Sequence, residues 1–152
     1  MGIFNSLDME LAEIEVSFTP KKHKRGFIRN SLEAHMAFSS IWDFGIIELF
    51  EEFKVIYLNR RMEILGAYHL SRGGLSQTVA DPRLIFSIGM KCGASSLLVA
   101  HNHPSGNVKP SKTDIALTEK LKEIGQLVEI PLNDHLILTK TKFFSFADQG
   151  LL

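Results

Sequence analysis

The chain has 152 residues, of which 45% are hydrophobic and 22% charged, and its 17 basic and 17 acidic side chains cancel. These values exclude a disordered, collagen-like or coiled-coil chain, and they argue against a protein that grips phosphate backbones through bulk charge. We expect one domain, which at this length buries roughly 70% of the surface of the unfolded chain.

Cysteine content and hydropathy predict a cytoplasmic protein. The single cysteine, Cys92, cannot pair within the chain or build a cysteine-rich zinc site. One unpaired cysteine fits a reducing compartment. No apolar run approaches the roughly 20 residues needed to cross a bilayer, and the N-terminus lacks the features of a signal peptide. We therefore expect no membrane partner, whereas the oligomeric state stays open.

The first part of the chain combines a strand pattern with a basic stretch. Apolar and polar residues alternate towards the end of residues 10–18, which predicts a half-buried strand at a sheet edge. Residues 21–25 are all basic or histidine, so they form either a solvated loop or a contact for nucleic acid or an acidic partner. We treat residues 1–28 as this strand and basic loop, and residues 29–152 as the main domain.

Helix and strand patterns then follow one another. Asn30 or Ser31 can cap a helix that runs through the forties. Residues 53–59 predict a buried strand, and residues 62–70 a second strand after a turn. Residues 71–74 end that strand in a loop.

The next predicted helix begins at Asp81 and Pro82 and ends before Gly93. It carries an apolar stripe, within which Cys92 is expected to be a small packing residue rather than a nucleophile. The stripe consists of Leu84, Ile85, Ile88 and Cys92.

The last third of the chain completes an alternation of strands and helices. Residues 96–100 predict a central strand, residues 112–125 a helix, and residues 135–139 a further strand. Such alternation predicts an α/β or mixed α+β domain in which helices cover a sheet.

The residues that can carry chemistry follow the predicted central strand. His101 and His103 are two positions apart, so their side chains share one face of an extended chain and can converge on one metal ion. Asp114 is the candidate third ligand. Two imidazoles and a carboxylate, with a fourth position for water, form the ligand pattern of catalytic zinc. The metal lowers the pKa of that water to about 7 and polarises a carbonyl group, and a nearby carboxylate can serve as general base.

Each of these residues also has a purely structural interpretation. A histidine at a strand end is commonly a packing residue. Ser111 and Asp114 match a capping box at the start of the predicted helix, so spacing alone leaves Asp114 equally able to be a cap or a ligand. An iron site with two histidines and one carboxylate has the same donors, but the alternating helices count against the all-β barrel usual for such oxygenases.

Several motifs resemble one known family. His101, His103, Pro104, Ser111 and Asp114 follow the pattern H-x-H-P…S-x-x-D, which is similar to the JAMM (MPN-plus) metalloprotease motif. The string HNHPSG resembles the RadC-type branch of that family, as do YLNR at 57–60, SRGG at 71–74, the pair Asp134-His135 and the ending SFADQGLL at 145–152.

The resemblance implies a three-layer α/β/α fold of the cytidine-deaminase-like kind, with a central mixed sheet. It implies Zn²⁺ held by His101, His103 and Asp114, and an oxyanion-stabilising role for Ser111. The general base of the family is a glutamate just before the first core strand. Glu51 and Glu52 both stand there, and the family spacing favours Glu51.

These implications give a working hypothesis and its rivals. The hypothesis is a zinc-dependent metallohydrolase of peptide or isopeptide bonds that acts on a peptide or protein substrate, with Glu51 as base and Ser111 and the metal stabilising the oxyanion. The alternative is a DNA-repair-associated, RadC-type protein that binds DNA without peptidase activity, which the zero net charge disfavours. A silent scaffold is a third possibility, against which the intact ligand set argues. Asp134 or His135 is expected either to support a ligand from behind or to be a satisfied structural pair.

Overall fold

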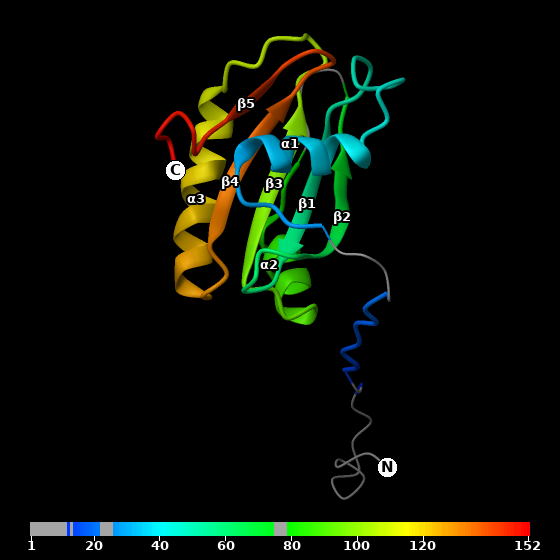
Figure 1. The fold of residues 1–152 in the computed structure, drawn as a ribbon, viewed down its shortest axis with the longest axis vertical. Helices are drawn as coiled ribbons and strands as arrows, with labels where there is room; N and C mark the ends of the chain where they lie inside the picture. Colours follow the sequence, from blue (N-terminus) through cyan, green and yellow to red (C-terminus); the bar gives the residue numbers. More distant parts are fainter. Residues whose placement is uncertain (1–11, 13, 22–25, 75–78) are drawn as a thin grey trace, which may run out of the picture.

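The computed structural model describes residues 12, 14–21, 26–74 and 79–152. These residues form an alternation of helices and strands, as the sequence predicts (Figure 1). The elements are α1 Ser31–Ser40, β1 Glu52–Leu58, β2 Ile64–Arg72, α2 Pro82–Lys91, β3 Ser96–Asn102, α3 Lys112–Leu127, β4 Leu132–Leu138 and β5 Phe143–Ser145.

The strands form one mixed sheet in the order β2-β1-β3-β4-β5. β1 pairs antiparallel with both β2 and β3, β3 pairs parallel with β4, and β4 pairs antiparallel with β5. Every residue of β1 and β3 is buried, which explains why these two strands are nearly continuous apolar runs. β3 is the middle strand, so the central strand predicted at 96–100 is confirmed.

Helices cover both faces of this sheet (Figure 1). Side chains on one face of the sheet, such as Ile56 and Leu98, pack in a core cluster with α1. Side chains on the opposite face, such as Val55 and Val99, pack in a second cluster with α2 and α3. The predicted α/β/α layering with a central mixed sheet is therefore confirmed.

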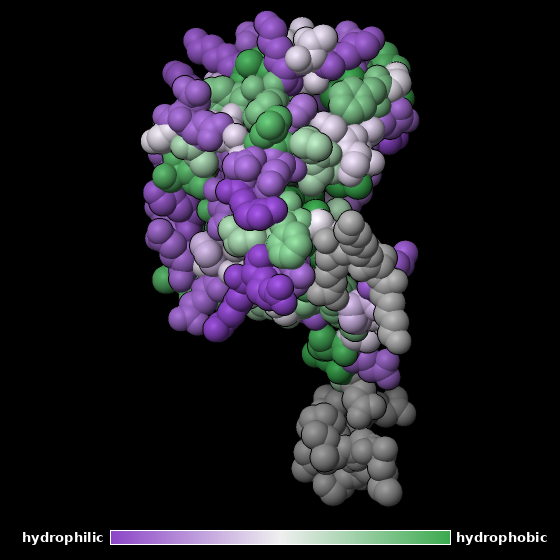
Figure 2. Space-filling view, in the orientation of Figure 1, coloured by the Kyte–Doolittle hydropathy of each residue, from purple (hydrophilic) through white to green (hydrophobic). Residues whose placement is uncertain are grey.

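The outer surface over α1 shows apolar and hydrophilic side chains next to one another (Figure 2). Leu32 and Met36 of α1 are among the exposed apolar residues. Single exposed apolar side chains are normal for a folded domain.

Helix α1 is shorter than predicted. Asn30 caps it by accepting a hydrogen bond from the Glu33 N–H group, as expected, but the helix ends at Ser40 and does not run through the forties. The chain leaves the helical path there because Trp42 and Ile47 turn inward into the core cluster beside α1. This turning segment leads directly to β1.

Helix α2 has the predicted ends, and Ile85, Ile88 and Cys92 of its predicted apolar stripe pack in the core. Asp81 is the N-cap, and Gly93 follows the C-cap with a φ of 68°, a backbone conformation that glycine adopts without steric cost. Cys92 is partly buried against the core, as expected for a packing residue. Leu84 is 49% exposed instead, because Phe86 takes the buried position on this helix.

The C-terminal elements are longer or more numerous than predicted. α3 extends to Leu127, and β4 begins three residues before the predicted strand at 135–139. β5 is a further strand that the sequence pattern did not predict. Its three residues are too few to show a periodicity, and it forms through pairing with β4.

The strand predicted over residues 10–18 is wrong for the part that the structure describes, residues 12 and 14–18, which are not in a strand. Ile14 and Val16 are 89% and 71% exposed, so the alternation buries no apolar face there. The other residues of that range lie outside the described chain, as do residues 22–25 of the basic stretch, for which a solvated loop and a contact with nucleic acid or an acidic partner both stay predictions. None of the described helices is both long enough and apolar enough to cross a membrane.

Candidate metal centre

One end of β3 and the start of α3 bring three potential ligands together. His101 is the penultimate residue of β3, His103 lies just beyond its end, and Asp114 stands in the first turn of α3. One ligand atom from each of the three lies within 4.8 Å of the others. The sequence-predicted set is therefore assembled in space, with His101 buried and the other two half-buried.

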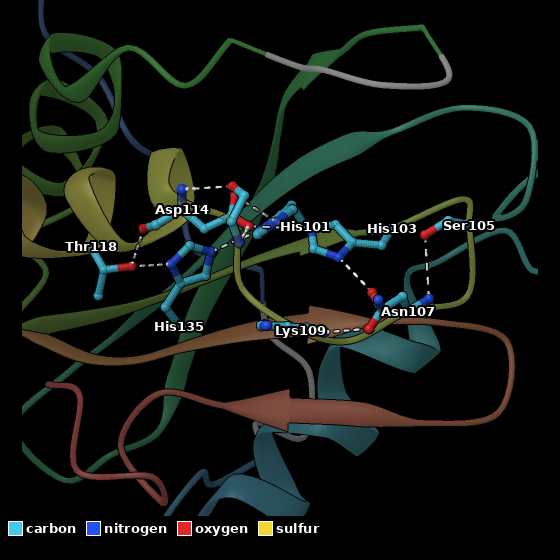
Figure 3. Close-up of polar contacts among 9 residues, drawn as sticks. His101, His103, Ser105, Asn107, Lys109, Asp114, Thr118 and His135 are labelled. Carbon is cyan, nitrogen blue, oxygen red and sulfur yellow. Dashed lines mark hydrogen bonds and ion pairs between the residues drawn. The ribbon is translucent and has the colours of Figure 1, made fainter.

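The separations inside this cluster fit a small tetrahedral ion. The Nε2 atoms of His101 and His103 are 3.0 Å apart. His101 Nε2 lies 3.2 Å from Asp114 Oδ1, and His103 Nε2 lies 3.3 Å from Asp114 Oδ2 (Figure 3). Zinc–ligand bonds of about 2.0–2.1 Å in tetrahedral geometry place neighbouring ligand atoms about 3.3 Å apart. The donor set and its spacing therefore fit Zn²⁺.

The tautomer of His103 is fixed by the loop that follows it. Its Nδ1 lies 2.7 Å from the main-chain carbonyl oxygen of Asn107. A carbonyl oxygen can only accept, so Nδ1 carries a hydrogen, and in the neutral ring Nε2 keeps its lone pair. Donation of the second ring N–H to a carbonyl is the usual arrangement of a metal-ligating histidine.

Asp114 serves as a helix cap and as a partner of both imidazoles. Ser111 is the N-cap of α3; its Oγ accepts a hydrogen bond from Asp114 N at 3.0 Å, and its own N–H donates to Asp114 Oδ2 at 2.7 Å. The capping box suggested by the sequence is thus confirmed. The same carboxylate faces His101 and His103, so the structural and ligand interpretations are compatible.

The charges of the cluster are strongly coupled. Burial would raise the pKa of Asp114, but its contacts with the imidazoles of His101 and His103 outweigh burial and hold that pKa well below its usual range. Burial would lower the pKa of His103, but hydrogen bonds to Asp114 and to the Asn107 carbonyl leave it raised. In the metal-free protein, a proton on His103 therefore balances the carboxylate, and a bound cation would replace that proton.

Asp134 and His135 have different roles: Asp134 is a structural residue, and His135 supports a candidate ligand from behind. Asp134 is structural, because its carboxylate accepts hydrogen bonds from Ser145 Oγ, Ala147 N and His135 N. His135 instead places Nε2 2.8 Å from Nδ1 of His101, directly behind the ligand (Figure 3). Burial above all, and the neighbouring His101 next, lower the pKa of His135 well below its usual value, so this ring is neutral.

The two candidate bases lie on opposite faces of the sheet. Glu52 is 2% exposed and belongs to the side of Ile56 and α1, where its carboxylate binds Arg72 at 3.0 Å and His69 at 3.0 Å. Glu51 precedes it in extended chain that is hydrogen-bonded to Gly73 and Gly74. Since successive extended residues alternate in direction, Glu51 shares the face of His101, and its negative charge contributes to the raised pKa of His103.

Three further residues shape the site and were not singled out from the sequence. Asn102 points away from the histidines that flank it, and its amide binds the carbonyl groups of Ile47 and Phe50 and the Glu52 N–H group, which anchors the segment that delivers Glu51. Thr118 contacts His135, and Asn107 contacts His103. Of the three, only Thr118 could have been found from the sequence, because it is four residues after Asp114 and therefore lies on the same helix face.

Comparisons with known proteins point to one family. The model of the RadC-like JAB domain family matches residues 28–151. The UPF0758 protein YkfG of Escherichia coli (strain K12) is 35% identical over 147 residues, which cover 97% of this chain and 85% of that protein. The UPF0758 protein of Flavobacterium johnsoniae is 43% identical over 101 residues, or 66% of this chain and 44% of that protein.

A third relative shows the same partial overlap. The UPF0758 protein of Porphyromonas gingivalis is 44% identical over 121 residues, which cover 79% of this chain and 53% of that protein. The chain thus spans about half the length of the latter two relatives, and the names of all three state no activity.

Proposed function

The chain belongs to the RadC-like JAB domain family, and on that premise we propose that it is a zinc-dependent metallohydrolase of peptide or isopeptide bonds. One observation carries the proposal. Two imidazole Nε2 atoms and the carboxylate of Asp114 converge at separations of 3.0–3.3 Å. A group of two histidines and one carboxylate leaves a fourth position of a tetrahedral ion open for water or substrate, as catalytic zinc sites do.

His101, His103 and Asp114 would hold the ion. When bound, Zn²⁺ supplies a Lewis acid that polarises a carbonyl group and makes a coordinated water more acidic. The chain must then provide a proton carrier and a donor for the negative charge that develops on the carbonyl oxygen.

We assign the proton-carrying role to Glu51. Its side chain shares a sheet face with His101 and is close enough to His103 to influence the charge of that ring. A carboxylate there accepts a proton from the attacking water and returns it to the leaving amine, so that the protein neither gains nor loses a proton over the reaction. Glu52, committed to Arg72 and His69 on the other face, is not placed for this role.

We assign the oxyanion-stabilising role to Ser111. Its Oγ accepts the Asp114 N–H bond, and a hydroxyl that accepts through a lone pair still has its hydrogen to donate. Ser111 is exposed at the start of α3, next to the ligand Asp114. A well-placed donor of this kind contributes about 3–4 kcal/mol of transition-state stabilisation in other enzymes.

The proposal is tested by metal analysis and a hydrolysis screen on the same samples. We expect one zinc per chain and cleavage of members of a quenched peptide library or of lysine-linked isopeptides, abolished by chelation and restored by Zn²⁺. His103→Ala should lose both metal and cleavage, whereas His35→Ala, a histidine change in α1, should keep both. Absence of zinc binding, or undiminished cleavage by His103→Ala, would contradict the proposal.

A further inference from the structure

The buried ring of His135 connects two of the candidate ligands through an ordered chain of hydrogen bonds. We propose that Thr118 and His135 are positioning residues that hold His101 as the tautomer with hydrogen on Nδ1, so that an unprotonated Nε2 faces the metal. This inference rests on the proposed metal site. It concerns the direction of each hydrogen bond in the chain, and that direction follows from the donors and acceptors present (Figure 3).

The first step is set by the helix backbone. Thr118 Oγ1 donates to the main-chain carbonyl oxygen of Asp114, one turn earlier in α3, at 2.7 Å. A hydroxyl has only one hydrogen. Towards His135 Nδ1, which lies 2.7 Å away, the Thr118 oxygen therefore acts as acceptor. His135 must carry its hydrogen on Nδ1.

The second step is set by the surroundings of His135. The ring is 0% exposed, and it stacks on Phe146 at 4.7 Å with Phe53 tilted against it at 5.8 Å. Aromatic walls of this kind favour the uncharged imidazole, which has one hydrogen and one lone pair. With its hydrogen on Nδ1, His135 presents a lone pair at Nε2.

The third step extends this arrangement of ring hydrogens from His135 to His101. His135 Nε2 lies 2.8 Å from His101 Nδ1, and since Nε2 accepts, His101 Nδ1 donates. His101 Nε2 is then the bare nitrogen, and it is the atom that faces Asp114 and His103. With the opposite order, a hydrogen on His101 Nε2 would occupy the position that the ion needs.

The chain of hydrogen bonds explains why His101 and His103, both candidate metal ligands, donate to different kinds of acceptor. His103 donates directly to a loop carbonyl, whereas His101 is buried within β3 and its Nδ1 meets a side chain of the neighbouring β4. The arrangement begins at the main chain of Asp114 and ends at His101. It thereby ties α3, β4 and β3 to one another behind the site, and it orients two of the three ligands together.

Two pairs of substitutions separate the hydrogen bond from the packing. Thr118→Val keeps the branched shape and removes the acceptor for His135, whereas Thr118→Ser keeps the hydroxyl. His135→Phe keeps the aromatic packing and removes both bonds, whereas His135→Gln can accept from His101 through its amide oxygen and donate to Thr118 through its NH₂ group. Thermal unfolding followed by circular dichroism identifies the variants that fold.

The first readout is nitrogen-15 NMR of the histidine side chains in the metal-free wild-type protein, which distinguishes protonated from bare ring nitrogens. We expect hydrogen on Nδ1 and a bare Nε2 in both His101 and His135. The reverse order in His135 would overturn the inference. This readout does not depend on catalysis, on metal binding or on the folding of any variant.

The second readout is zinc affinity, measured by competition with a chromophoric chelator. We expect Thr118→Val and His135→Phe to bind zinc about 10- to 100-fold more weakly, and Thr118→Ser and His135→Gln to stay close to wild type. Wild-type affinity in a folded Thr118→Val would refute the inference while leaving the hydrolase proposal intact. Conversely, a wild-type protein that binds no zinc would refute the metal site, while the tautomers would still show whether the chain of bonds exists.

Discussion

Phe53 of β1 lies directly opposite His101 of β3, and the two rings stack with centroids 6.0 Å apart and planes 6° apart. The pairing fixes which side of β1 faces the candidate metal centre. Phe53 shares its face of the sheet with Val55 and Tyr57. Glu51 lies two residues before Phe53, so its side chain points to that same face. The sheet register therefore favours Glu51 over Glu52 independently of any family spacing.

Exchanging each glutamate for glutamine separates the two positions. Glu51→Gln should retain zinc but lower kcat/KM by about 10²- to 10⁴-fold, because an amide cannot carry the proton. Glu52→Gln should leave the chemistry in place and weaken the buried contacts with Arg72 and His69, which lowers the free energy of unfolding by about 1–3 kcal/mol. Metal analysis, kinetics and denaturant unfolding distinguish the outcomes, and an active Glu51→Gln beside an inactive Glu52→Gln would reverse the assignment.

Ser111 has two roles that different substitutions can separate. Ser111→Ala removes both the helix cap and the hydroxyl donor, so stability should fall by about 1 kcal/mol together with activity. Ser111→Gly costs only a few tenths of a kcal/mol as a cap, yet it should lose as much activity, because the donor to the oxyanion is gone. Ser111→Thr, which keeps both functions, is the control. Activity that tracks stability across this series would show that Ser111 is only a cap.

Local patterns predicted much of the fold and most of the candidate site. The strands β1 to β4 and the starts of all three helices follow from apolar periodicity and from caps such as Asn30 and Asp81. The strand prediction for residues 10–18 is wrong in its described part, because alternating hydropathy shows only that a segment could cover a core. Ile14 and Val16 show the same pattern as a real edge strand but stay exposed.

The sequence left open whether Asp134 or His135 supports a ligand, because that choice depends on tertiary packing. The link from His101 to His135 joins residues 34 positions apart, and that from His135 to Thr118 joins residues 17 apart. Both depend on the parallel pairing of β3 with β4 and on the packing of α3. The carbonyl of Asn107 is invisible to side-chain patterns altogether, although it orients His103.

Rising pH should have opposite effects on the metal-free protein and on zinc binding. The folded pKa of His103 is raised above its ordinary value of 6.5, so its stabilising contribution is fully present below that value and is lost as the pH rises through the folded pKa. The lowered pKa of Asp114 keeps its carboxylate ionised in this window, and its own contribution disappears only in acid. Protons compete with metal for the imidazoles, so zinc affinity should increase over the same range.

The measurement pairs denaturant unfolding of the metal-free protein with chelator competition between about pH 6 and 8. We expect the free energy of unfolding to decrease and the zinc association constant to increase across the series. Zinc affinity that does not change with pH would show that His103 is not one of the ligands.

The close approach of α3 to β4 is the geometric condition for the contact between Thr118 and His135, and Gly125 makes that approach possible. A Cβ atom at this position would stand 2.7 Å from the carbonyl oxygen of Ile130 and 3.2 Å from the backbone of both Pro131 and Leu132. Helix propensity alone favours alanine over glycine by about 1 kcal/mol. These neighbours are backbone atoms, however, and they cannot move aside as a flexible side chain would.

We therefore expect Gly125→Ala to destabilise the protein by about 1–3 kcal/mol in spite of its better helix propensity, as measured by denaturant unfolding. The displaced helix should also lengthen the contact between Thr118 and His135, so zinc affinity should fall in the folded variant. Gly66→Ala is the matched control, because a Cβ there meets no atom within 4 Å, and it should leave both quantities nearly unchanged. If Gly125→Ala raised stability as propensity predicts, α3 and β4 would not be held at the distance on which the order of the His101 hydrogen bonds depends.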